Sequence, residues 1–454
     1  MGHDKVRLGL HGLFSAFVCG VAVLFCLYPA FVVGRLLFDS KLMQEGQSGL
    51  VPGWFESLSC RYRVWAESYL AAGYALQVEE TDVAGTEWPM FGSVFFLVTA
   101  DELQRQGLID ARQGTVRKAV EKAAEVVVDP DTATWVKAKW GDAYLARENV
   151  FYRMLLILGT ASYERLTADT RYRALMSEQR KGLAAELARA RYHVLDDYPY
   201  ECWPSDVLWA VAAIQRAAEL EGDGCPELVR ALLGALDGPL NVSGLPAYKV
   251  DKSSGQVWER PRGCGNSGIL SFAAELDADV AARWYREYEA RFWKENVWLA
   301  GFTEMPRGSS ELVSDVDSGP VLCEFGSVAS AFGIGASKAV GRMDRAAVLT
   351  MEAVACSWPT PFGFLFPMAM GKLAMDGGCL AETALLFSMT RPNRLGRSVP
   401  FEGRVPLIVW GMLLAYAGTG TFFLLAEFLA WRKKMKNERR LPPDAGGGFG
   451  GPAA

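Results

Sequence analysis

Two long uncharged segments, one near each end of the chain, constrain the fold most. Residues 8–34 contain no Asp, Glu, Lys or Arg, and neither do residues 405–426. A helix needs about 20 apolar residues to cross a lipid bilayer, and both segments reach that length. We therefore predict two transmembrane helices, at residues 8–38 and 405–431. Removal of the first segment as a signal peptide is the alternative.

Basic residues predict the orientation of these helices. Lys5 and Arg7 precede the first segment, and six Lys or Arg residues lie between positions 432 and 440. Because basic flanks stay on the cytoplasmic side, we expect residues 1–7 and the basic, then Gly- and Pro-rich, tail 432–454 in the cytoplasm. Residues 39–404 then form a domain outside the cytoplasm.

The composition excludes several classes of protein. The chain is 50% hydrophobic and 12% aromatic, unlike a disordered chain. Its net charge is -5 although both ends are basic, so the domain between the two segments is acidic. A broad basic surface for nucleic acid is therefore not expected. We expect a small-molecule substrate and the membrane as partners, and the sequence is also compatible with a homo-oligomer.

The domain is predicted to be all-α. Most of its long segments place apolar residues three and four positions apart, which is typical of helices. Strand patterns are few, and residues 245–259 fit a hairpin that turns at Ser254-Gly255. The helical spacing covers residues 119–128, 149–166, 172–190, 207–220, 225–236, 269–276, 280–293 and 328–340.

Three Trp-Pro pairs suggest how the helices are arranged. Trp88-Pro89, Trp203-Pro204 and Trp358-Pro359 each precede an apolar run. Proline suits the first turn of a helix, where its missing N–H needs no partner, so we interpret the pairs as equivalent helix starts. About a dozen helices in repeated hairpins would form a closed ring of six hairpins, an (α/α)6 barrel. A helical solenoid is the alternative, but no constant repeat period is present.

Candidate catalytic and binding residues lie close to the helix starts and in the loops before them. A partly desolvated carboxyl or thiol can have a pKa near the working pH, as general acid–base catalysis requires. Paired carboxyls can also share a proton. The alternatives are helix capping, a polar loop and an inert buried cysteine. Expected catalytic residues are Glu87, Cys202, Asp206, Asp315 and Asp317. Expected substrate-binding residues are Trp88, Tyr152, Tyr200, Trp203, Arg262 and Cys264.

Metal and cofactor motifs are missing from the sequence. His193 is the only histidine after the first apolar segment, and no Cys-x-x-Cys is present. A histidine-based zinc site needs more ligands than this. The Gly333-x-Gly335 pair lies in a helical run and lacks the spacing of a dinucleotide-binding loop, so it indicates close helix packing. We therefore predict no metal and no cofactor.

Four stretches, in the same order, resemble the bacterial linalool dehydratase/isomerase family. They are residues 148–167, the cluster Cys202–Asp206, residues 279–295 and residues 315–341. The resemblance implies an extracytoplasmic (α/α)6 barrel that removes water from, or isomerises, a small terpene alcohol without a cofactor. The enzymes of that family are soluble once exported, whereas the two apolar segments of this chain predict a two-pass protein of a bacterial inner (cytoplasmic) membrane. Two positions depart from the family: Leu155 replaces a catalytic histidine, and Val211 replaces a functional cysteine.

Three functions are compatible with these patterns. The first is a cofactor-free lyase or isomerase that uses acid–base chemistry on a hydroxylated apolar or lipid-like substrate. The second is a carbohydrate-active hydrolase, since six-hairpin barrels can carry paired carboxylates and Trp faces suit sugar rings. The third is a membrane-associated binding protein whose barrel has lost its chemistry.

Overall fold

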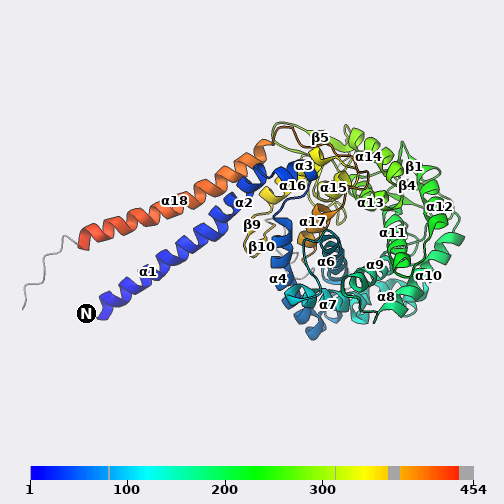
Figure 1. Ribbon diagram of the computed structural model, residues 1–454, viewed down its shortest axis with the longest axis horizontal. Coiled ribbons are helices and arrows are strands. Elements are labelled where there is room, and N and C mark those ends of the chain that lie inside the picture. The colour runs from blue at the N-terminus through cyan, green and yellow to red at the C-terminus, as the bar shows by residue number, and fades with distance from the viewer. Residues whose placement is uncertain (1, 80–81, 312, 367–378, 439–454) are drawn as a thin grey trace, which may run out of the picture.

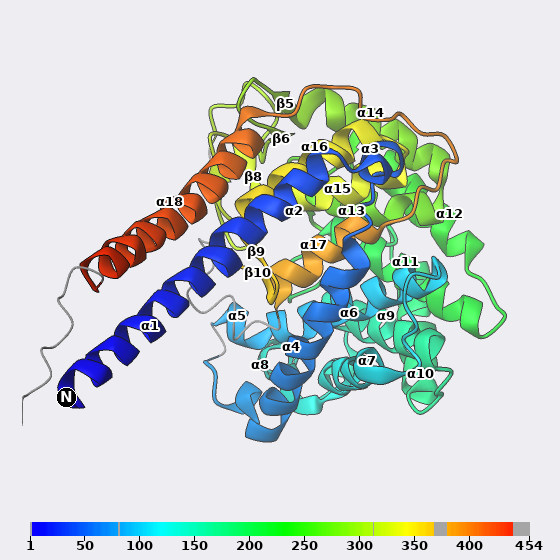
Figure 2. The same cartoon turned by 60° about the vertical axis from the view of Figure 1, so that its left-hand side comes forward.

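The computed structural model describes residues 2–79, 82–311, 313–366 and 379–438. The chain is mostly helical, and the strands of the described part form only short, two-stranded hairpins. Two long terminal helices lie side by side and project together from a domain of shorter helices (Figures 1 and 2). The prediction of a helical fold with a long apolar helix near each end is confirmed.

Both terminal helices have the dimensions of membrane spans. α1 (Gly2–Ala22), a π-helical turn (Val23–Leu27) and α2 (Tyr28–Leu37) form one continuous helix, and α18 (Leu407–Glu438) packs along it. Residues Gly12–Leu37 and Leu407–Lys436 are long and apolar enough to cross a membrane. The π-helical turn precedes Pro29, which lacks the N–H of a regular helical hydrogen bond.

Twelve helices of the domain fall into two alternating sets. The central helices are α6 (Trp88–Arg105), α9 (Val150–Thr167), α11 (Pro204–Leu220), α13 (Gly263–Leu276), α15 (Ser327–Ala339) and α17 (Leu380–Thr390). Each packs against the next, and α17 packs against α6. The flanking helices, which lie outside the central ones in Figure 1, are α4 (Val51–Ala72), α7 (Gly114–Val128), α10 (Arg173–Arg189), α12 (Pro226–Asp237), α14 (Ala278–Phe292) and α16 (Met343–Cys356).

Short elements connect these helices. α3 (Ser40–Glu45), α5 (Val83–Thr86) and α8 (Thr134–Trp140) lie in the first part of the chain. The antiparallel hairpins pair β1 (Asn241–Val242) with β2 (Leu245–Pro246), β3 (Lys249–Val250) with β4 (Val257–Glu259), β5 (Trp293–Glu295) with β6 (Ala300–Phe302), β7 (Val321–Leu322) with β8 (Phe325–Gly326), and β9 (Pro359–Thr360) with β10 (Gly363–Phe364).

The helical periodicity located the helices well. Each of the eight predicted stretches coincides with a helix, from α7 and α9 through α15. The predicted turn is also confirmed, because Gly255 lies between β3 and β4 with a φ of +75°. Gly333 packs closely, as expected: a Cβ there would come within 2.5 Å of the Phe302 ring.

Two of the three Trp-Pro pairs begin helices, as predicted. Trp88-Pro89 begins α6, and Trp203-Pro204 begins α11. Both prolines lie in the first turn of their helices, where the missing N–H leaves no carbonyl without a partner.

The prediction for the third Trp-Pro pair is wrong. Trp358 has a φ of +47°, and Pro359 begins the strand β9 instead of a helix. Proline is also compatible with the first residue of a strand, so the pair alone cannot distinguish the two structures.

Aromatic side chains from all six central helices meet in the middle of the domain. The ring centroids of Phe95 and Phe387 are 4.7 Å apart, those of Trp209 and Phe272 are 4.9 Å apart, and Phe332 lies 5.6 Å from Phe95. The group, here called the aromatic core, consists of Phe91, Phe95, Phe151, Trp209, Phe272, Phe332 and Phe387. It separates the N-terminal ends of the central helices from their C-terminal ends.

A substitution in the aromatic core tests its contribution to stability. Phe387 is fully buried, so Phe387→Ala leaves a cavity and should lower the free energy of unfolding by about 3–5 kcal/mol. Val64→Ala, on the exposed surface of α4, should change it by less than about 0.5 kcal/mol. Denaturation of the full chain in detergent measures both. Equal effects of the two substitutions would contradict this account.

Candidate active site

Three carboxyl groups gather at the N-terminal ends of the central helices, here called the acidic end. Glu87 directly precedes α6, Asp206 lies in the first turn of α11, and Asp317 lies in the loop before α15. The three groups are close enough to influence one another, because the charge of Asp317 raises the pKa of both Glu87 and Asp206. The chain therefore brings together three of the five predicted catalytic residues.

Glu87 is held by a tyrosine from the loop before α11. The hydroxyl of Tyr198 donates a hydrogen bond to Oε1 of Glu87, with an O···O distance of 2.5 Å. Burial and the charge of Asp317 raise the pKa of Glu87 to about 7, although the hydrogen bond from Tyr198 lowers it. Glu87 is therefore divided between its acid and its carboxylate at neutral pH.

Of Glu87 and Asp206, Asp206 has the higher pKa. Burial raises its pKa to about 8, and the charges of Asp317 and Glu87 add to this rise, while a hydrogen bond from Ser205 opposes it. The start of α11 also favours a negative charge, because a helix N-terminus carries a partial positive charge. Burial and like charges outweigh both effects, so Asp206 is mostly protonated at pH 7.

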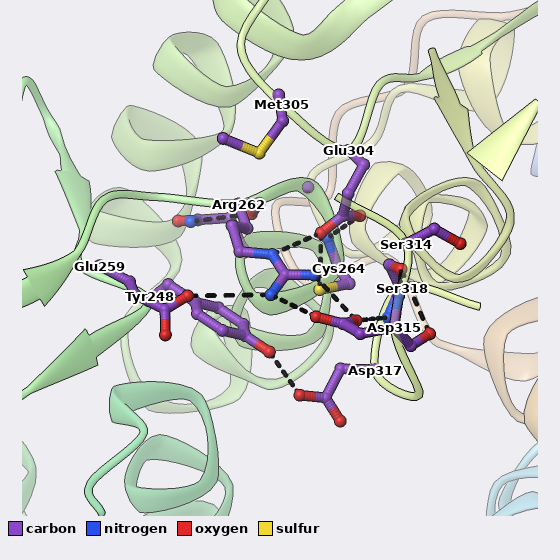
Figure 3. Close-up of polar contacts among 12 residues, drawn as sticks. Tyr248, Glu259, Arg262, Cys264, Glu304, Met305, Ser314, Asp315, Asp317 and Ser318 are labelled. Carbon is purple, nitrogen blue, oxygen red and sulfur yellow. Dashed lines mark hydrogen bonds and ion pairs between the residues drawn. The ribbon is translucent and has the colours of Figure 1, made fainter. Parts of the chain in front are cut away.

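Asp317 is the end of a chain of polar contacts (Figure 3). Its Oδ2 accepts a hydrogen bond of 2.5 Å from the hydroxyl of Tyr248. The guanidinium of Arg262 lies over the Tyr248 ring, 4.3 Å from its centroid. Arg262 in turn donates two hydrogen bonds to Asp315, of 2.9 and 3.0 Å, and one of 2.8 Å to Glu304. Arg262 thus holds the ring of Tyr248 in place, while the Tyr248 hydroxyl faces Asp317.

The pKa of Asp315 differs in direction from those of Glu87 and Asp206. Burial acts to raise it, but the hydrogen bonds and charge of Arg262 outweigh burial and lower the pKa of Asp315. The two aspartates that were expected to act as a pair thus bind different partners, because Asp315 pairs with Arg262 and Asp317 with Tyr248. Asp315 holds an arginine in place, and the carboxyl is ionised.

Both candidate thiols are buried and protonated. Burial, followed by the charge of Asp197, raises the pKa of Cys202 well above its usual value. Burial, followed by the charge of Glu304, does the same for Cys264, whose Sγ donates a hydrogen bond of 3.1 Å to Oε1 of Glu304. A protonated thiol can donate a hydrogen bond but is a poor nucleophile. All nine cysteines of the chain are free thiols.

Two of the predicted aromatic residues lie beside the carboxyl groups. Trp88 is the first residue of α6, next to Glu87, and is half-buried. Trp203 is also half-buried, and its ring lies edge-on to Tyr198 at a centroid distance of 6.1 Å. The ammonium group of Lys249 lies 4.6 Å from the centroid of the Trp203 ring.

The other two predicted aromatic residues do not join this group. Tyr152 is buried against Trp135 of α8 and against Tyr144, at centroid distances of 5.8 and 5.4 Å. Tyr200 is 83% exposed, because it occupies the turn before α11 with a φ of +70°. Its side chain therefore faces solvent, unlike the half-buried Trp88 and Trp203.

Sequence reasoning missed the residues that hold the carboxyls. Tyr198 and Asp197 lie just before the cluster 200–206 and continue its density of polar groups, which was an available signal. Burial and the charge of Asp206 raise the pKa of Asp197 well above its usual value. Tyr248 and Glu304 carried no such signal, because each reaches the site only through the fold.

At the C-terminal ends of the central helices, the buried carboxyls are paired with arginines. Arg216 donates hydrogen bonds of 2.8 Å to both Glu102 and Glu275, and Arg391 pairs with Glu275. Burial acts to raise the pKa of Glu102, but Arg216 and Arg391 outweigh it and hold the pKa at about 2. We call these C-terminal ends the arginine end. Its carboxyls form structural ion pairs, whereas Glu87 and Asp206 at the acidic end have no such arginine partner in the described part of the chain.

Comparison with protein families and with curated proteins identified no relative of this chain. No protein-family model matches the chain, and no curated protein matches it. Among the described residues, no three His, Cys, Asp or Glu side chains converge in a way that could hold a metal ion. The function must therefore be argued from the geometry of the acidic end.

The raised pKa values predict how stability depends on pH. In the folded chain Asp206 keeps its proton up to about pH 8, whereas an unfolded aspartate loses it near pH 4. The folded state thus binds the extra proton in this window, and stability falls as pH rises through it. Asp206→Asn removes this contribution. The variant should be as stable as the wild type near pH 4, and more stable at pH 8–9 by on the order of a few kcal/mol.

The control for this measurement is Glu311→Gln, which changes an exposed carboxyl in the loop before Asp315. Its stability should follow that of the wild type at every pH. Denaturation of each variant in detergent between pH 4 and pH 9 gives the three curves. A constant difference between wild type and Asp206→Asn over this range would show that Asp206 titrates normally.

Proposed function

We propose that residues 39–404 form an (α/α)6 barrel that two transmembrane helices attach to the outer side of a bacterial inner membrane. The closed order of contacts among the six central helices supports the barrel, as does their strict alternation with the flanking helices. The two long apolar helices support the membrane attachment, and the basic residues in the last turns of α18 and just after it support its orientation.

We further propose that the acidic end is the active site of a cofactor-free lyase or isomerase. The observation that carries this proposal is the pair Glu87 and Asp206, whose pKa values are raised to about 7 and about 8 beside a third carboxyl, Asp317. General acid–base catalysis is most effective when the pKa lies near the working pH. Glu87 and Asp206 are partly buried and have no arginine partner in the described part of the chain, an arrangement that lowers stability, so their presence together supports a functional role.

The proposed reaction removes water from an alcohol. Protonated Asp206 donates its proton to the hydroxyl oxygen, and the C–O bond breaks with release of water. A carboxylate, Glu87 or Asp317, takes a proton from the adjacent carbon, and the electrons of that C–H bond form the new double bond. The proton gained by this carboxylate returns Asp206 to its acid form through solvent, so no redox partner is needed. In an isomerisation, water adds back at a different carbon.

The surroundings of the carboxyls suit an apolar substrate with one polar group. Tyr198 and Tyr248 hold Glu87 and Asp317 at fixed positions by their short hydrogen bonds. Asp206 lies about one helical turn before Trp209 of the aromatic core. Aromatic faces also stabilise the positive charge that develops on carbon as the C–O bond breaks.

The resemblance to the linalool dehydratase/isomerase family supports the reaction class and not the same substrate. Leu155 replaces the histidine of that family and is fully buried in α9, one turn after Phe151 of the aromatic core. The leucine makes this wall more apolar and removes a proton acceptor. We therefore propose an alcohol that is more apolar than linalool around its reacting carbon.

Turnover tests the role of the carboxyl pair. Loss of a general acid typically lowers the rate by roughly 10²–10⁴-fold, and we expect this loss for Asp206→Asn. The exposed control Glu311→Gln should keep wild-type turnover. The assay presents a panel of tertiary and allylic alcohols, including long isoprenoid alcohols, in vesicles and detects the dehydrated product by mass. The wild-type rate should be greatest near pH 7–8, between the pKa values of the two carboxyls.

Several outcomes would contradict the proposal. Robust conversion of linalool to myrcene would show that Leu155 does not change the substrate class. Cleavage of an oligosaccharide panel with dependence on Glu87 and Asp206 would favour the carbohydrate-active hydrolase. Specific binding without turnover of any alcohol would favour a non-catalytic binding protein.

Reporter fusions test the membrane topology. A reporter at the C-terminus should be active in the cytoplasm, because basic residues are concentrated in the last turns of α18 and just after it. A reporter inserted at Ser253-Ser254, an exposed turn between β3 and β4, should be active on the other side. A cytoplasmic signal from both fusions would reject the proposed two-pass arrangement.

A further inference from the structure

The path of α2 along α16 determines the direction in which the terminal helices leave the domain. Just beyond the C-terminal end of α16, Nε1 of Trp358 donates a hydrogen bond of 2.7 Å to the carbonyl of Phe25. At the N-terminal end of α16, Gly46 packs against the side chain of Met343. The chain between residues 25 and 46 thus runs antiparallel to α16. The preceding helix α1 must therefore extend beyond the C-terminal end of α16.

The helix α18 leaves the domain on the same side. It begins beside the tip of the β5–β6 hairpin, where Leu407 donates a backbone hydrogen bond to Val297. Nine residues later the hydroxyl of Tyr416 donates to the carbonyl of Ala355, near the C-terminal end of α16. The remaining part of α18 projects past this point, alongside α1.

This side of the domain is the acidic end. α15 and α16 are joined by a short turn and pack against each other, so the C-terminal end of α16 lies beside the N-terminal end of α15. Figure 1 shows both terminal helices projecting from one side of the ring of central helices, next to α16. The terminal helices therefore leave the domain beside the acidic end, at the C-terminal end of α16.

The projecting part of α18 is short for a membrane span. Sixteen residues separate Tyr416, which is bound to the domain, from Arg432, and this is about 24 Å of helix. The hydrocarbon core of a bilayer is about 30 Å thick. A span of this length leaves no gap between the domain and the bilayer, so the acidic end must touch the outer leaflet or sink into it.

The surface at this end is suited to such a contact. The described connections that lead from a flanking helix into a central helix lie at the acidic end. Large exposed apolar side chains lie on them, namely Leu76, Tyr200, Trp258, Val297, Trp298, Val316, Leu322 and Phe362. Phe362 is 58% exposed at the tip of the β9–β10 hairpin, and β9 packs against α2 and the π-helical turn. This tip therefore lies next to the point where the helices leave the domain.

We propose that the rim of the acidic end, with Phe362 at its membrane-proximal edge, docks on the outer leaflet and that the substrate is an alcohol dissolved in the bilayer. This inference rests on the proposed function and its two-pass topology. The occupant of the rim is lipid and not a protein, because the same rim continues directly into the two membrane-spanning helices. A membrane-dissolved alcohol would reach Glu87 and Asp206 without crossing water.

Lipid quenching tests the docked rim in the full chain. Three exposed cysteines, Cys60, Cys323 and Cys356, are first changed to serine, and a bimane label is placed on Phe362→Cys. The labelled chain is reconstituted into vesicles of phosphatidylethanolamine and phosphatidylglycerol that contain phospholipid with a nitroxide near the headgroup. The parent without the new cysteine gives the background signal.

The matched control is Val399→Cys. Val399 is also an exposed apolar residue, but its carbonyl accepts a hydrogen bond from Asp344 at the start of α16, which places it at the arginine end. The Phe362→Cys label should be quenched at least about twofold more strongly than the Val399→Cys label. Equal quenching, or stronger quenching at Val399→Cys, would overturn the proposed docking.

Two further readouts keep this test separate from the proposed function. Flotation of the vesicles with the labelled chain shows that the protein is membrane-bound, so weak quenching in floated samples counts against the docked rim alone. Phe362→Asp should then lower turnover of a long isoprenoid alcohol in vesicles several-fold, while turnover of a short water-soluble alcohol stays unchanged. Equal loss for both alcohols would mean that the substrate does not enter from the bilayer.

Discussion

The aromatic core is the contact on which the remaining structure depends. Each of the six central helices contributes at least one ring, and the ring centroids lie 4.4–6.2 Å apart. Such contacts fix the distances between helix axes, because aromatic rings are large and rigid and fill the space between them completely. The N-terminal ends of the helices are thereby held at set distances too. The side chains that begin α6 and α11 owe their proximity to rings about one turn further along each helix.

The same core separates a buried network of arginines and carboxylates from Glu87 and Asp206, which have no arginine partner in the described part of the chain. At the arginine end, Arg216 and Arg391 keep the carboxyls of Glu102 and Glu275 ionised and paired. At the acidic end burial and like charges prevail, which keeps Asp206 protonated. Burying a carboxyl without a cation costs free energy, and a protein tolerates this cost only when other parts of the fold supply stability. The buried aromatic core is a part of the fold that supplies it.

The sequence predicted more of the fold than of the site. Helical periodicity is a local property, so it located the helices, and a proline in the first turn marked the starts of α6 and α11. Glu87 was predicted from its place beside the Trp88-Pro89 helix start, and Asp206 and Asp317 were predicted from local groups of polar residues. Their partners were not, since Tyr198 is 111 residues from Glu87 and Tyr248 is 69 residues from Asp317 along the chain. Local spacing carries no information about such contacts.

The raised pKa values and the proposed membrane-facing rim would have a common physical basis. A carboxyl holds its proton at neutral pH only where water is scarce, and an apolar substrate in contact with Asp206 would exclude water further. The charge of the departing hydroxyl is then neutralised by the proton of Asp206 and not by solvent. A substrate that came from water would have to shed its own hydration first, whereas one that came from the bilayer would already be dry around its carbon chain. A site that relies on desolvated carboxyls therefore benefits from lying directly against the membrane.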